Sequence, residues 1–539
     1  MISSKFICVW QWLHNVRLPS CLAHRQRSAL LVFAVLVLLP PSVARTRRRA
    51  APLAARIDTI LQQTGANRGF WGIEVARLPD GELLYTRNGN RLFQPASNMK
   101  LFTTAAALAK LGPDFIFRTT VESTAPADAQ GRVPDLILVG RGDPNLGGRV
   151  LPYYLKAEER SPADIDFQNL ADQVVQKGVR EVTGDLVADT SYYVEEPFEP
   201  EWAVDDMVWG YGAPVTALAF NGNCLKLHFA PGPTVGSEAT VTLDPIPGYY
   251  RLVTGVKTSS AGEPEKLTIE RAPGSMELDI GGQIPLGSGG TDALVAVQDP
   301  PQLIGEMFRH ELEQRGVKID GSVVIHRLTP LDAAGEADGV SQPAVQAGPR
   351  AVLAEHDSLP LREDVKVTLK VSQNLHAEML LRTLAHQVRG VGSLEGGLEI
   401  LRDFARGIGI APDAIYFSGG SGLSRNTLVT PEALIDLLKF MSRSPDFQDF
   451  YDALPISGVD GTLADRFQNT IVEGRIHAKT GTLEHVNTLS GYMDLPGGRR
   501  LAFAIMSNNQ SMESAEINRA IDKIALQIYR SFAPASRSR

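Results

Sequence analysis

The sequence predicts an α+β fold in which one antiparallel sheet is split by a long β-rich insertion. Residues 71–76 and 82–85 have strand character and flank Pro79-Asp80-Gly81, whose residue types are typical of a hairpin turn. Three more strand-like segments lie near the C-terminus, and helical segments accompany both groups. From about residue 116 to 345, short alternating segments are interrupted by Gly and Pro. The hairpin and the C-terminal strands could therefore complete one antiparallel sheet around the inserted middle.

The segments before the insertion predict two helices. Residues 51–64 have the apolar periodicity of a helix. An alanine-rich run begins at Ser97, continues to Leu111 and stops at Gly112-Pro113, a pair that ends helices. Because this second run is evenly apolar, we expect its helix to be buried.

The inserted region predicts mostly strands, with one clear helix at 302–314 that leads into a strand at 323–327. Residues 333–347, rich in Ala, Gly, Asp and Pro, are expected to form a linker or loop. Beyond residue 352 the sequence again predicts helices, followed by a strand meander. The expected elements there are helices at 371–389, 394–407 and 431–442, strands at 475–483, 488–494 and 500–507, and a closing amphipathic helix at 515–532.

Composition indicates a folded protein of several domains. At roughly 150 residues per domain, 539 residues correspond to about three or four domains. Apolar residues make up 43% and charged residues 21%, close to the globular average, which excludes wholesale disorder. Acidic residues (61) outnumber Lys and Arg (53), and no basic stripe offsets them. This balance disfavours a nucleic-acid partner, because phosphate binding needs a basic surface.

The N-terminus predicts export. Residues 29–39 are almost wholly apolar, follow Arg25 and Arg27, and lead through two prolines to Ser42-Val43-Ala44. This pattern is typical of a signal peptide, here residues 1–44, with an uncleaved membrane anchor as the alternative. The apolar run is short for a span of about 20 residues. We therefore expect an exported protein of the periplasm or cell envelope, and leave open a peripheral membrane association.

The cysteines exclude a disulfide framework in such an exported chain. Two of the three, Cys8 and Cys21, precede residue 44, which leaves Cys224 alone. One thiol can form neither an intramolecular disulfide nor a cysteine metal cluster. We expect Cys224 to be a small buried hydrophobic residue. The sequence also lacks a His-Glu-x-x-His motif, so we expect no metal and no other cofactor.

Ser97 and Lys100 have the spacing of a nucleophile and its base. At positions i and i+3 of one helix, they lie one turn apart on the same face. A serine hydroxyl must lose its proton to attack a carbonyl, and a lysine can accept this proton when burial or a neighbouring cation lowers its pKa. A helix cap followed by a solvated lysine has the same spacing, so this motif alone leaves both interpretations open.

Two further motifs fit a peptide-binding site. Lys479-Thr480-Gly481-Thr482 lies in a predicted strand; at a sheet edge facing a cleft, its ammonium and hydroxyl can hold a carboxylate, while Gly481 allows close backbone approach. Ser372-Gln373-Asn374 offers a hydroxyl to relay a proton and an amide to hold a peptide carbonyl. Ser424-Arg425-Asn426 and Ser507-Asn508-Asn509 share its Ser-x-Asn pattern. The tripeptide at Ser372 is preferred because it lies between the other two motifs in chain order.

In this order, Ser-x-x-Lys, Ser-x-Asn and Lys-Thr-Gly form the motif set of β-lactamases and penicillin-binding proteins. The sequence resembles, more specifically, the penicillin-binding D-alanyl-D-alanine carboxypeptidase/endopeptidase family of low molecular mass (class C), which carries a large insertion after the nucleophile helix. The resemblance covers roughly residues 52–532 and includes, in order, Pro95–Lys100, Gly142–Pro144, Tyr211–Pro214, His356–Leu361, Ser421–Arg425, Gly458–Thr462 and His477–Thr482. The long spacing between Lys100 and Ser372 matches that insertion rather than a compact β-lactamase.

The resemblance implies a β-lactamase/transpeptidase-like domain, with an antiparallel five-stranded sheet and helices on both faces, split by inserted β-rich domains. The expected limits are 1–44 for the signal peptide, 45–115 and 348–539 for the transpeptidase-like domain, 116–234 and 321–347 for inserted domain II, and 235–320 for a nested β-rich domain III. The oligomeric state is left open.

The resemblance also implies a serine D,D-peptidase acting on peptidoglycan stem peptides. It would cleave D-Ala-D-Ala termini, D-Ala cross-links or both, and β-lactam antibiotics would inhibit it covalently. Ser97 would attack the penultimate D-Ala carbonyl with Lys100 as the base. Ser372 would then pass the proton to the leaving amine.

The remaining motif residues would bind the substrate. Backbone N–H groups of Ser97 and Thr482 would form the oxyanion hole. Asn374 would orient the peptide, and Thr480 would bind its terminal carboxylate. Lys479 would supply positive potential and help depress the pKa of Lys100.

Two other functions stay open, a β-lactamase-like hydrolase and a catalytically inactive wall-binding scaffold. A Ser-His-Asp hydrolase is disfavoured because no Gly-x-Ser-x-Gly motif occurs. Gln373 stands where the β-lactamase motif has Asp. Because the family pattern requires only Ser and Asn, this departure bears on substrate preference rather than on catalysis.

Overall fold

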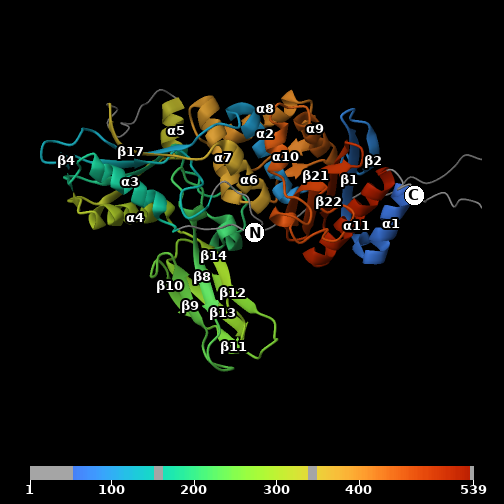
Figure 1. Ribbon diagram of the computed structural model, residues 1–539, viewed down its shortest axis with the longest axis horizontal. Helices are drawn as coiled ribbons and strands as arrows, with labels where there is room; N and C mark the ends of the chain where they lie inside the picture. Colours follow the sequence, from blue (N-terminus) through green and yellow to red (C-terminus); the bar gives the residue numbers. More distant parts are fainter. Residues whose placement is uncertain (1–51, 151–161, 338–348, 534–539) are drawn as a thin grey trace, which may run out of the picture. The chain divides into compact units, whose positions relative to one another are not determined.

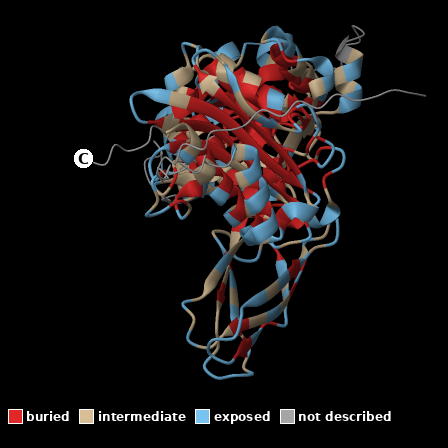
Figure 2. Ribbon diagram, turned by 90° about the vertical axis from the view of Figure 1, so that its right-hand side faces the viewer, coloured by how far each residue is buried: buried red, intermediate tan, exposed pale blue. Residues whose placement is uncertain are grey.

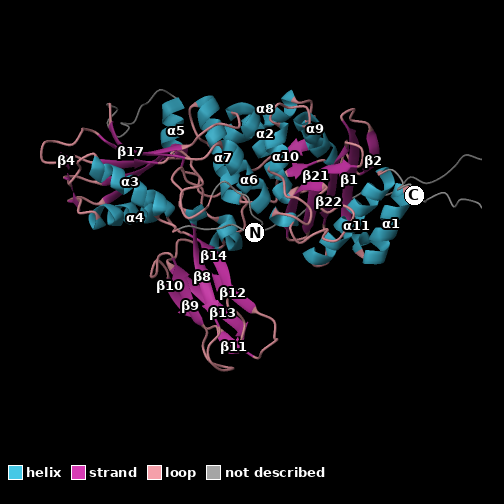
Figure 3. Cartoon of the chain, viewed as in Figure 1, coloured by secondary structure: helices cyan, strands magenta, loops and turns pink. Residues whose placement is uncertain are grey.

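The computed structural model describes residues 52–150, 162–337 and 349–533 of the chain. The predicted signal peptide, with its apolar run at 29–39, lies outside these residues. None of the helices in the described ranges combines the length and the apolarity that crossing a bilayer requires. Figure 1 labels many of the described elements along the chain, and Figure 3 distinguishes helices from strands.

A five-stranded antiparallel sheet unites N-terminal and C-terminal strands in the order β2-β1-β22-β21-β20. The hairpin supplies β1 (Phe70–Leu78) and β2 (Leu83–Arg87), and the meander supplies β20 (Ile476–Leu483), β21 (Val486–Leu495) and β22 (Arg499–Asn508). β1 pairs with β22 along its whole length. The prediction that hairpin and meander complete one sheet is therefore confirmed, and β20 is an edge strand.

Helices cover both faces of this sheet. α1 (Leu53–Thr64) and α11 (Ser514–Phe532) share one core with alternate strand residues. α2 (Met99–Leu111) and α9 (Pro431–Met441) share a second core with strand residues of the opposite register, which point to the other face. β21 and β22 are almost entirely buried between these layers (Figure 2).

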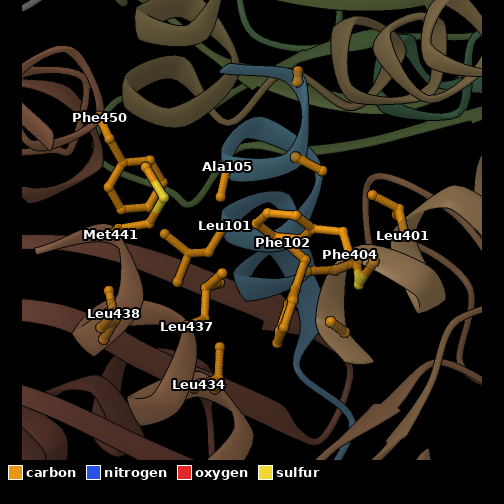
Figure 4. Packing of buried hydrophobic residues seen from close by; sticks show 14 of the residues in the cluster. Leu101, Phe102, Ala105, Leu401, Phe404, Leu434, Leu437, Leu438, Met441 and Phe450 are labelled. Carbon is orange, nitrogen blue, oxygen red and sulfur yellow. The ribbon is translucent and has the colours of Figure 1, made fainter. Parts of the chain in front are cut away.

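α2 is buried through most of its length, which confirms the prediction from its even apolarity. Residues 99–108 are all buried. The helix packs against α8 (Leu394–Gly407), α9 and α10 (Phe447–Asp452). Figure 4 shows the apolar side chains of this contact, namely Leu101, Phe102 and Ala105 of α2 with Leu401, Phe404, Leu434, Leu437, Leu438, Met441 and Phe450. Because such a core is close-packed, it fixes the position of α2.

α7 (Asn374–Arg389) starts later than the predicted helix at 371–389. A π-helical turn (Val367–Val371) ends at Ser372, whose left-handed backbone, with φ of 70°, breaks the helix. The Gln373 side chain then caps α7 by accepting a backbone N–H of its first turn at 3.2 Å. Ser372 therefore lies in a turn between helices rather than within one.

The insertion contains a second five-stranded sheet, ordered β16-β7-β5-β3-β17. Its strands are β3 (Arg118–Ser123), β5 (Leu136–Val139), β7 (Leu186–Val194), β16 (Val323–Leu328) and β17 (Ala351–Asp357). α3 (Ile165–Gln176) and α4 (Pro300–Gln314) share a core with this sheet. α6 (Leu361–Lys366) follows β17 and leads into the turn before Ser372.

Two helices of the insertion correct the sequence prediction, which had only the helix at 302–314 there. α3 was not predicted. α5 (Pro330–Ala337) occupies the start of the predicted loop at 333–347. At the start of α5, Asp332 Oδ2 accepts from the Thr329 N–H and Thr329 Oγ1 accepts from the Asp332 N–H, both at 3.2 Å. This pair resembles a capping box, which starts a helix in spite of the Gly content.

The most strand-rich part of the insertion forms two small sheets around one core. They consist of β8 (Cys224–Ala230), β9 (Thr240–Asp244) and β14 (Thr291–Ala296), and of β10 (Arg251–Thr254), β11 (Lys257–Ser259), β12 (Lys266–Glu270) and β13 (Glu277–Pro285). The remaining strands, β4 (Arg132–Val133), β6 (Glu181–Val182), β15 (Lys318–Ile319), β18 (Ile415–Tyr416) and β19 (Leu428–Val429), are short. Cys224 is buried, as expected. The domain limits drawn from the sequence stay predictions.

Candidate active site

Ser97 lies in a short 3₁₀ turn (Ala96–Asn98) that leads directly into α2. The turn is fastened to the sheet because Asn98 Nδ2 donates to Ser490 Oγ of β21 at 2.8 Å. Ala96 has a left-handed backbone with φ of 47°, a conformation that is rare for residues other than glycine and that clusters at functional sites. Ser97 is therefore held between the sheet and a buried helix.

Lys100 is fully buried one turn further along, and its amine has three oxygen neighbours. Nζ lies 2.9 Å from Ser97 Oγ, 2.6 Å from Asn374 Oδ1 and 2.9 Å from the Ser421 carbonyl oxygen. Asn374 begins α7, and its Nδ2 donates to the Tyr211 carbonyl at 2.8 Å. These contacts fix the amine beside the serine hydroxyl.

Burial lowers the pKa of the Lys100 amine to about 7. The negative charge of the neighbouring Glu378–Glu199 carboxyl pair acts in the opposite direction. With a pKa near neutrality, a large fraction of the amine is unprotonated at neutral pH and can accept a proton from a hydroxyl 2.9 Å away. Burial, one of the two causes that the sequence suggested, is thus the largest cause of the lowered pKa.

Lys479 forms a second pair with Ser372. It lies in the edge strand β20 and is fully buried. Its Nζ donates to Ser372 Oγ at 2.8 Å and to the carbonyl of Thr480 at 2.9 Å. Burial, and then the charge of Lys100, hold the pKa of the Lys479 amine well below its ordinary value. Ser372 lies two residues before Asn374, the partner of Lys100, so both pairs belong to one site.

β20 approaches the Ser97 turn closely at Gly481. A Cβ at this position would lie 2.8 Å from the Pro95 carbonyl oxygen and 3.0 Å from the Ala96 Cβ, so a side chain would push the turn away. The neighbouring Thr480 is half-buried, and its Oγ1 donates to Thr462 Oγ1 at 2.7 Å. The Lys-Thr-Gly strand therefore forms one wall beside the serine.

Comparison with known proteins identifies the family. Residues 53–528 match the model of the D-Ala-D-Ala carboxypeptidase 3 (S13) family. The chain belongs to this family. The D-alanyl-D-alanine carboxypeptidase of Actinomadura sp. (strain R39) is 34% identical, over 89% of this chain and 86% of that protein. The D-alanyl-D-alanine carboxypeptidase DacB of Haemophilus influenzae is 25% identical, over 84% of this chain and 87% of that protein.

A solved structure shares the fold of this S13 protein. Penicillin binding protein 4 (dacB) from Haemophilus influenzae superposes with a TM-score of 0.73 and 22% identity, over 88% of this chain and 98% of that one. The likeness confirms the predicted transpeptidase-like fold with inserted domains. Membership of the S13 family identifies the chain as a serine-type D-Ala-D-Ala carboxypeptidase.

The structure of this S13 enzyme brings most of the predicted site residues together. Ser97, Lys100 and Asn374 form one hydrogen-bonded group, Ser372 and Lys479 a second, and Gly481 packs against the Ser97 turn, while Thr480 and Thr482 lie on the same edge strand. The other two Ser-x-Asn tripeptides have different surroundings. Ser424 Oγ donates to Glu201 at 3.1 Å, and Ser507 Oγ accepts from Gln510.

Sequence reasoning assigned no role to several residues that shape the site. Tyr211, Ser421 and Thr462 each lie in a stretch on which the family resemblance rested, but spacing alone could not show their contacts. Two of them act through backbone carbonyls, for which side-chain identity gives no signal. Glu378 and Glu199 influence the pKa of the Lys100 amine, but nothing in the sequence sets them apart from other acidic residues.

Proposed function

We propose that this S13 enzyme removes the terminal D-Ala from peptides ending in D-Ala-D-Ala through an acyl-enzyme on Ser97. Ser97 Oγ attacks the carbonyl carbon of the penultimate D-Ala, and the Lys100 amine takes the hydroxyl proton. The C–N bond to the terminal D-Ala breaks, and Ser372 passes the proton that Lys100 took up on to the leaving amine, so that Lys100 and Ser372 end the step as they began it. Water then hydrolyses the ester, which releases the shortened peptide and restores the serine hydroxyl.

The observation that carries this proposal is the Lys100 amine. It lies 2.9 Å from Ser97 Oγ, and burial brings its pKa to about 7. A general base works best when its pKa is near the working pH, because it is then both unprotonated and basic enough to accept the proton. An exposed lysine with an ordinary pKa would be protonated and could not serve in this way.

The strand wall supplies the substrate contacts. The Thr480 hydroxyl, positioned by Thr462, holds the terminal carboxylate of the substrate, and the Lys479 amine supplies positive potential beside it. The Asn374 side chain orients the peptide. The backbone N–H groups of Ser97 and Thr482 stabilise the negative charge that develops on the carbonyl oxygen. Support for these roles comes from the closeness of β20 to the Ser97 turn.

Peptidoglycan stem peptides are the proposed substrates, and β-lactams the covalent inhibitors. The name of the Actinomadura relative gives D-alanyl-D-alanine carboxypeptidase activity, and the Haemophilus influenzae protein has been solved in complex with a β-lactam. The same mechanism can cleave cross-linked peptides, because the acyl group transferred to Ser97 is identical and only the leaving amine differs. Such a substrate lies outside the cytoplasm, in keeping with the proposed export to the periplasm or cell envelope.

Labelling with a fluorescent penicillin tests the nucleophile. The wild-type protein should take up the label covalently, Ser97→Ala should take up none, and the matched control Ser531→Ala, on the distant helix α11, should label like the wild type. A well-folded wild type that takes up no label would instead favour the inactive scaffold. Rapid turnover of penicillin without release of D-Ala from a pentapeptide would favour the β-lactamase.

Two peptide substrates separate the two peptidase activities. Release of D-Ala from a monomeric pentapeptide measures carboxypeptidase activity, and conversion of a cross-linked muropeptide into monomers measures endopeptidase activity. We expect both products from the wild type and neither from Ser97→Ala. Retention of either activity in Ser97→Ala would contradict the proposed acyl-enzyme.

A further inference from the structure

A glycine-rich loop, residues 419–422, lies against the first turns of α2. The Ser421 carbonyl accepts a hydrogen bond from the Lys100 amine at 2.9 Å, and the Gly420 carbonyl accepts one from Thr103 Oγ1 at 2.7 Å. One of the three oxygen neighbours of the Lys100 amine therefore belongs to this loop. The position of the loop therefore determines how the Ser421 carbonyl oxygen is oriented toward the Lys100 amine.

The carboxylate of Glu378 holds this loop in place. Glu378 is fully buried in α7, one turn beyond Asn374. Its Oε2 accepts from the Gly420 N–H at 3.0 Å, and its Oε1 accepts from the Ser421 N–H at 2.6 Å. Two successive N–H groups on one carboxylate fix the orientation of the peptide group that precedes Ser421. Charge-assisted bonds of this kind are stronger than neutral ones.

The groups around Glu378 favour the ionised form of its carboxyl group. Glu199 is buried next to it, and the pKa of Glu199 is raised well above its ordinary value by burial and by the nearby Glu378. The pKa of Glu378 is lowered because hydrogen bonds and the guanidinium of Arg382 together outweigh its burial. Arg382 lies one turn along α7 and donates to the Glu378 carbonyl at 3.2 Å. Glu199 is therefore the neutral partner of the two.

The charged groups that face the Lys100 amine are thus of both signs. Glu378, with Glu199 and Arg382 behind it, lies on the α7 side, and Lys479 lies on the β20 side. The negative charge of Glu378 favours the protonated form of Lys100. The Lys479 amine disfavours it, because two cations would then lie close together. Of these groups, Glu378 is the one that also holds the loop.

We propose that Glu378 is a positioning residue for acylation, which holds the Ser421 carbonyl against the Lys100 amine and whose charge offsets part of the penalty for protonating that buried amine. This inference rests on the proposed function of Lys100 as the base for Ser97. Glu378 touches neither the nucleophile nor the substrate in this scheme. It acts through the loop and through its charge.

The pH profile of the acylation rate separates this role from a purely structural one. In the wild type, we expect the rate of acylation by a fluorescent penicillin to rise with pH around pH 7, where Lys100 loses its proton. This rise is the acid limb of the profile, and the constant rate above it is the plateau rate. Glu378→Gln removes a negative charge, so the Lys100 pKa should fall and the acid limb should move to lower pH by about one unit. The plateau rate of this variant should fall about tenfold or more, because an N–H of the new side-chain amide would face a backbone N–H of the loop.

Two further variants serve as controls. Glu199→Gln keeps a neutral hydrogen-bond donor beside Glu378, so its acid limb should coincide with that of the wild type. Glu378→Asp keeps the charge but shortens the reach to the loop, so its plateau rate should fall while its acid limb stays near pH 7. Because Glu378→Asp retains the buried charge, it also tests the proposal if Glu378→Gln does not fold.

The outcomes distinguish this inference from the proposed function. A wild type that is not acylated at all would refute the function of Ser97 itself. Normal acylation of the wild type, with an unshifted acid limb in folded Glu378→Gln, would refute the role of the Glu378 charge. A plateau rate in Glu378→Asp equal to that of the wild type would refute the positioning of the loop.

Discussion

Replacing Gly422 by alanine should disable the site without touching any group that performs the chemistry. Gly422 has φ of +80°, and a Cβ added there would lie 2.0 Å from the Ala96 carbonyl oxygen and 2.9 Å from the Met99 Cβ. Real Cβ contacts shorter than 3.0 Å essentially do not occur, so the Gly422 loop and the turn that carries Ser97 must separate by about 1 Å. A displacement of this size at a reacting atom costs about 10²-fold in rate.

The expected result is a loss of about 100-fold in kcat/KM for release of D-Ala from a pentapeptide. Gly65→Ala is the matched control. Gly65 ends α1 with φ of +76°, and a Cβ there meets nothing within 4 Å. This variant should lose only about 1 kcal/mol for the left-handed backbone, seen as a small fall in Tm, with kcat/KM unchanged. Folded Gly422→Ala with kcat/KM within threefold of the wild type would refute the reasoning, as would an equal loss in Gly65→Ala.

Two predictions concern stability. Leu437→Ala, at a fully buried position in the core around α2, should cost about 2–5 kcal/mol, whereas Leu331→Ala, with 85% exposure, should leave the Tm unchanged; equal Tm values for both would contradict this core. Burial raises the pKa of Asp143 from 3.8 to about 7, so the folded state loses stability as pH rises from about 4 to about 7, where this carboxyl is ionised in the unfolded chain but still protonated in the folded one. Asp143→Asn should therefore raise the Tm more at pH 8 than at pH 4.5, and thermal melts with the same gain at both pH values would contradict the buried charge.

Local patterns determined much of this fold. The segment at 394–407 was predicted as a helix, and α8 begins and ends at those residues, because its apolar periodicity and flanking caps are contained in the segment itself. The hairpin was predicted because Pro79-Asp80-Gly81 encodes its own turn. α3 was missed although its buried residues follow a helical spacing; they are Phe167, Leu170, Ala171 and Val174. The helical spacing was thus present in the sequence, but the Gly and Pro residues of the inserted region led to a prediction of strands there.

The site divides in the same way. The sequence by itself predicted that the side chains of Ser97 and Lys100 could meet, because a separation of three positions in a helical turn fixes that geometry locally; the turn is the 3₁₀ turn that leads into α2. Only the tertiary structure decided that Asn374, 274 positions away from Lys100, would touch the same amine, and that Lys479 would meet Ser372 across 107 positions. The lowered pKa of Lys100 is likewise tertiary, because removing an amine from water requires neighbours brought from distant segments.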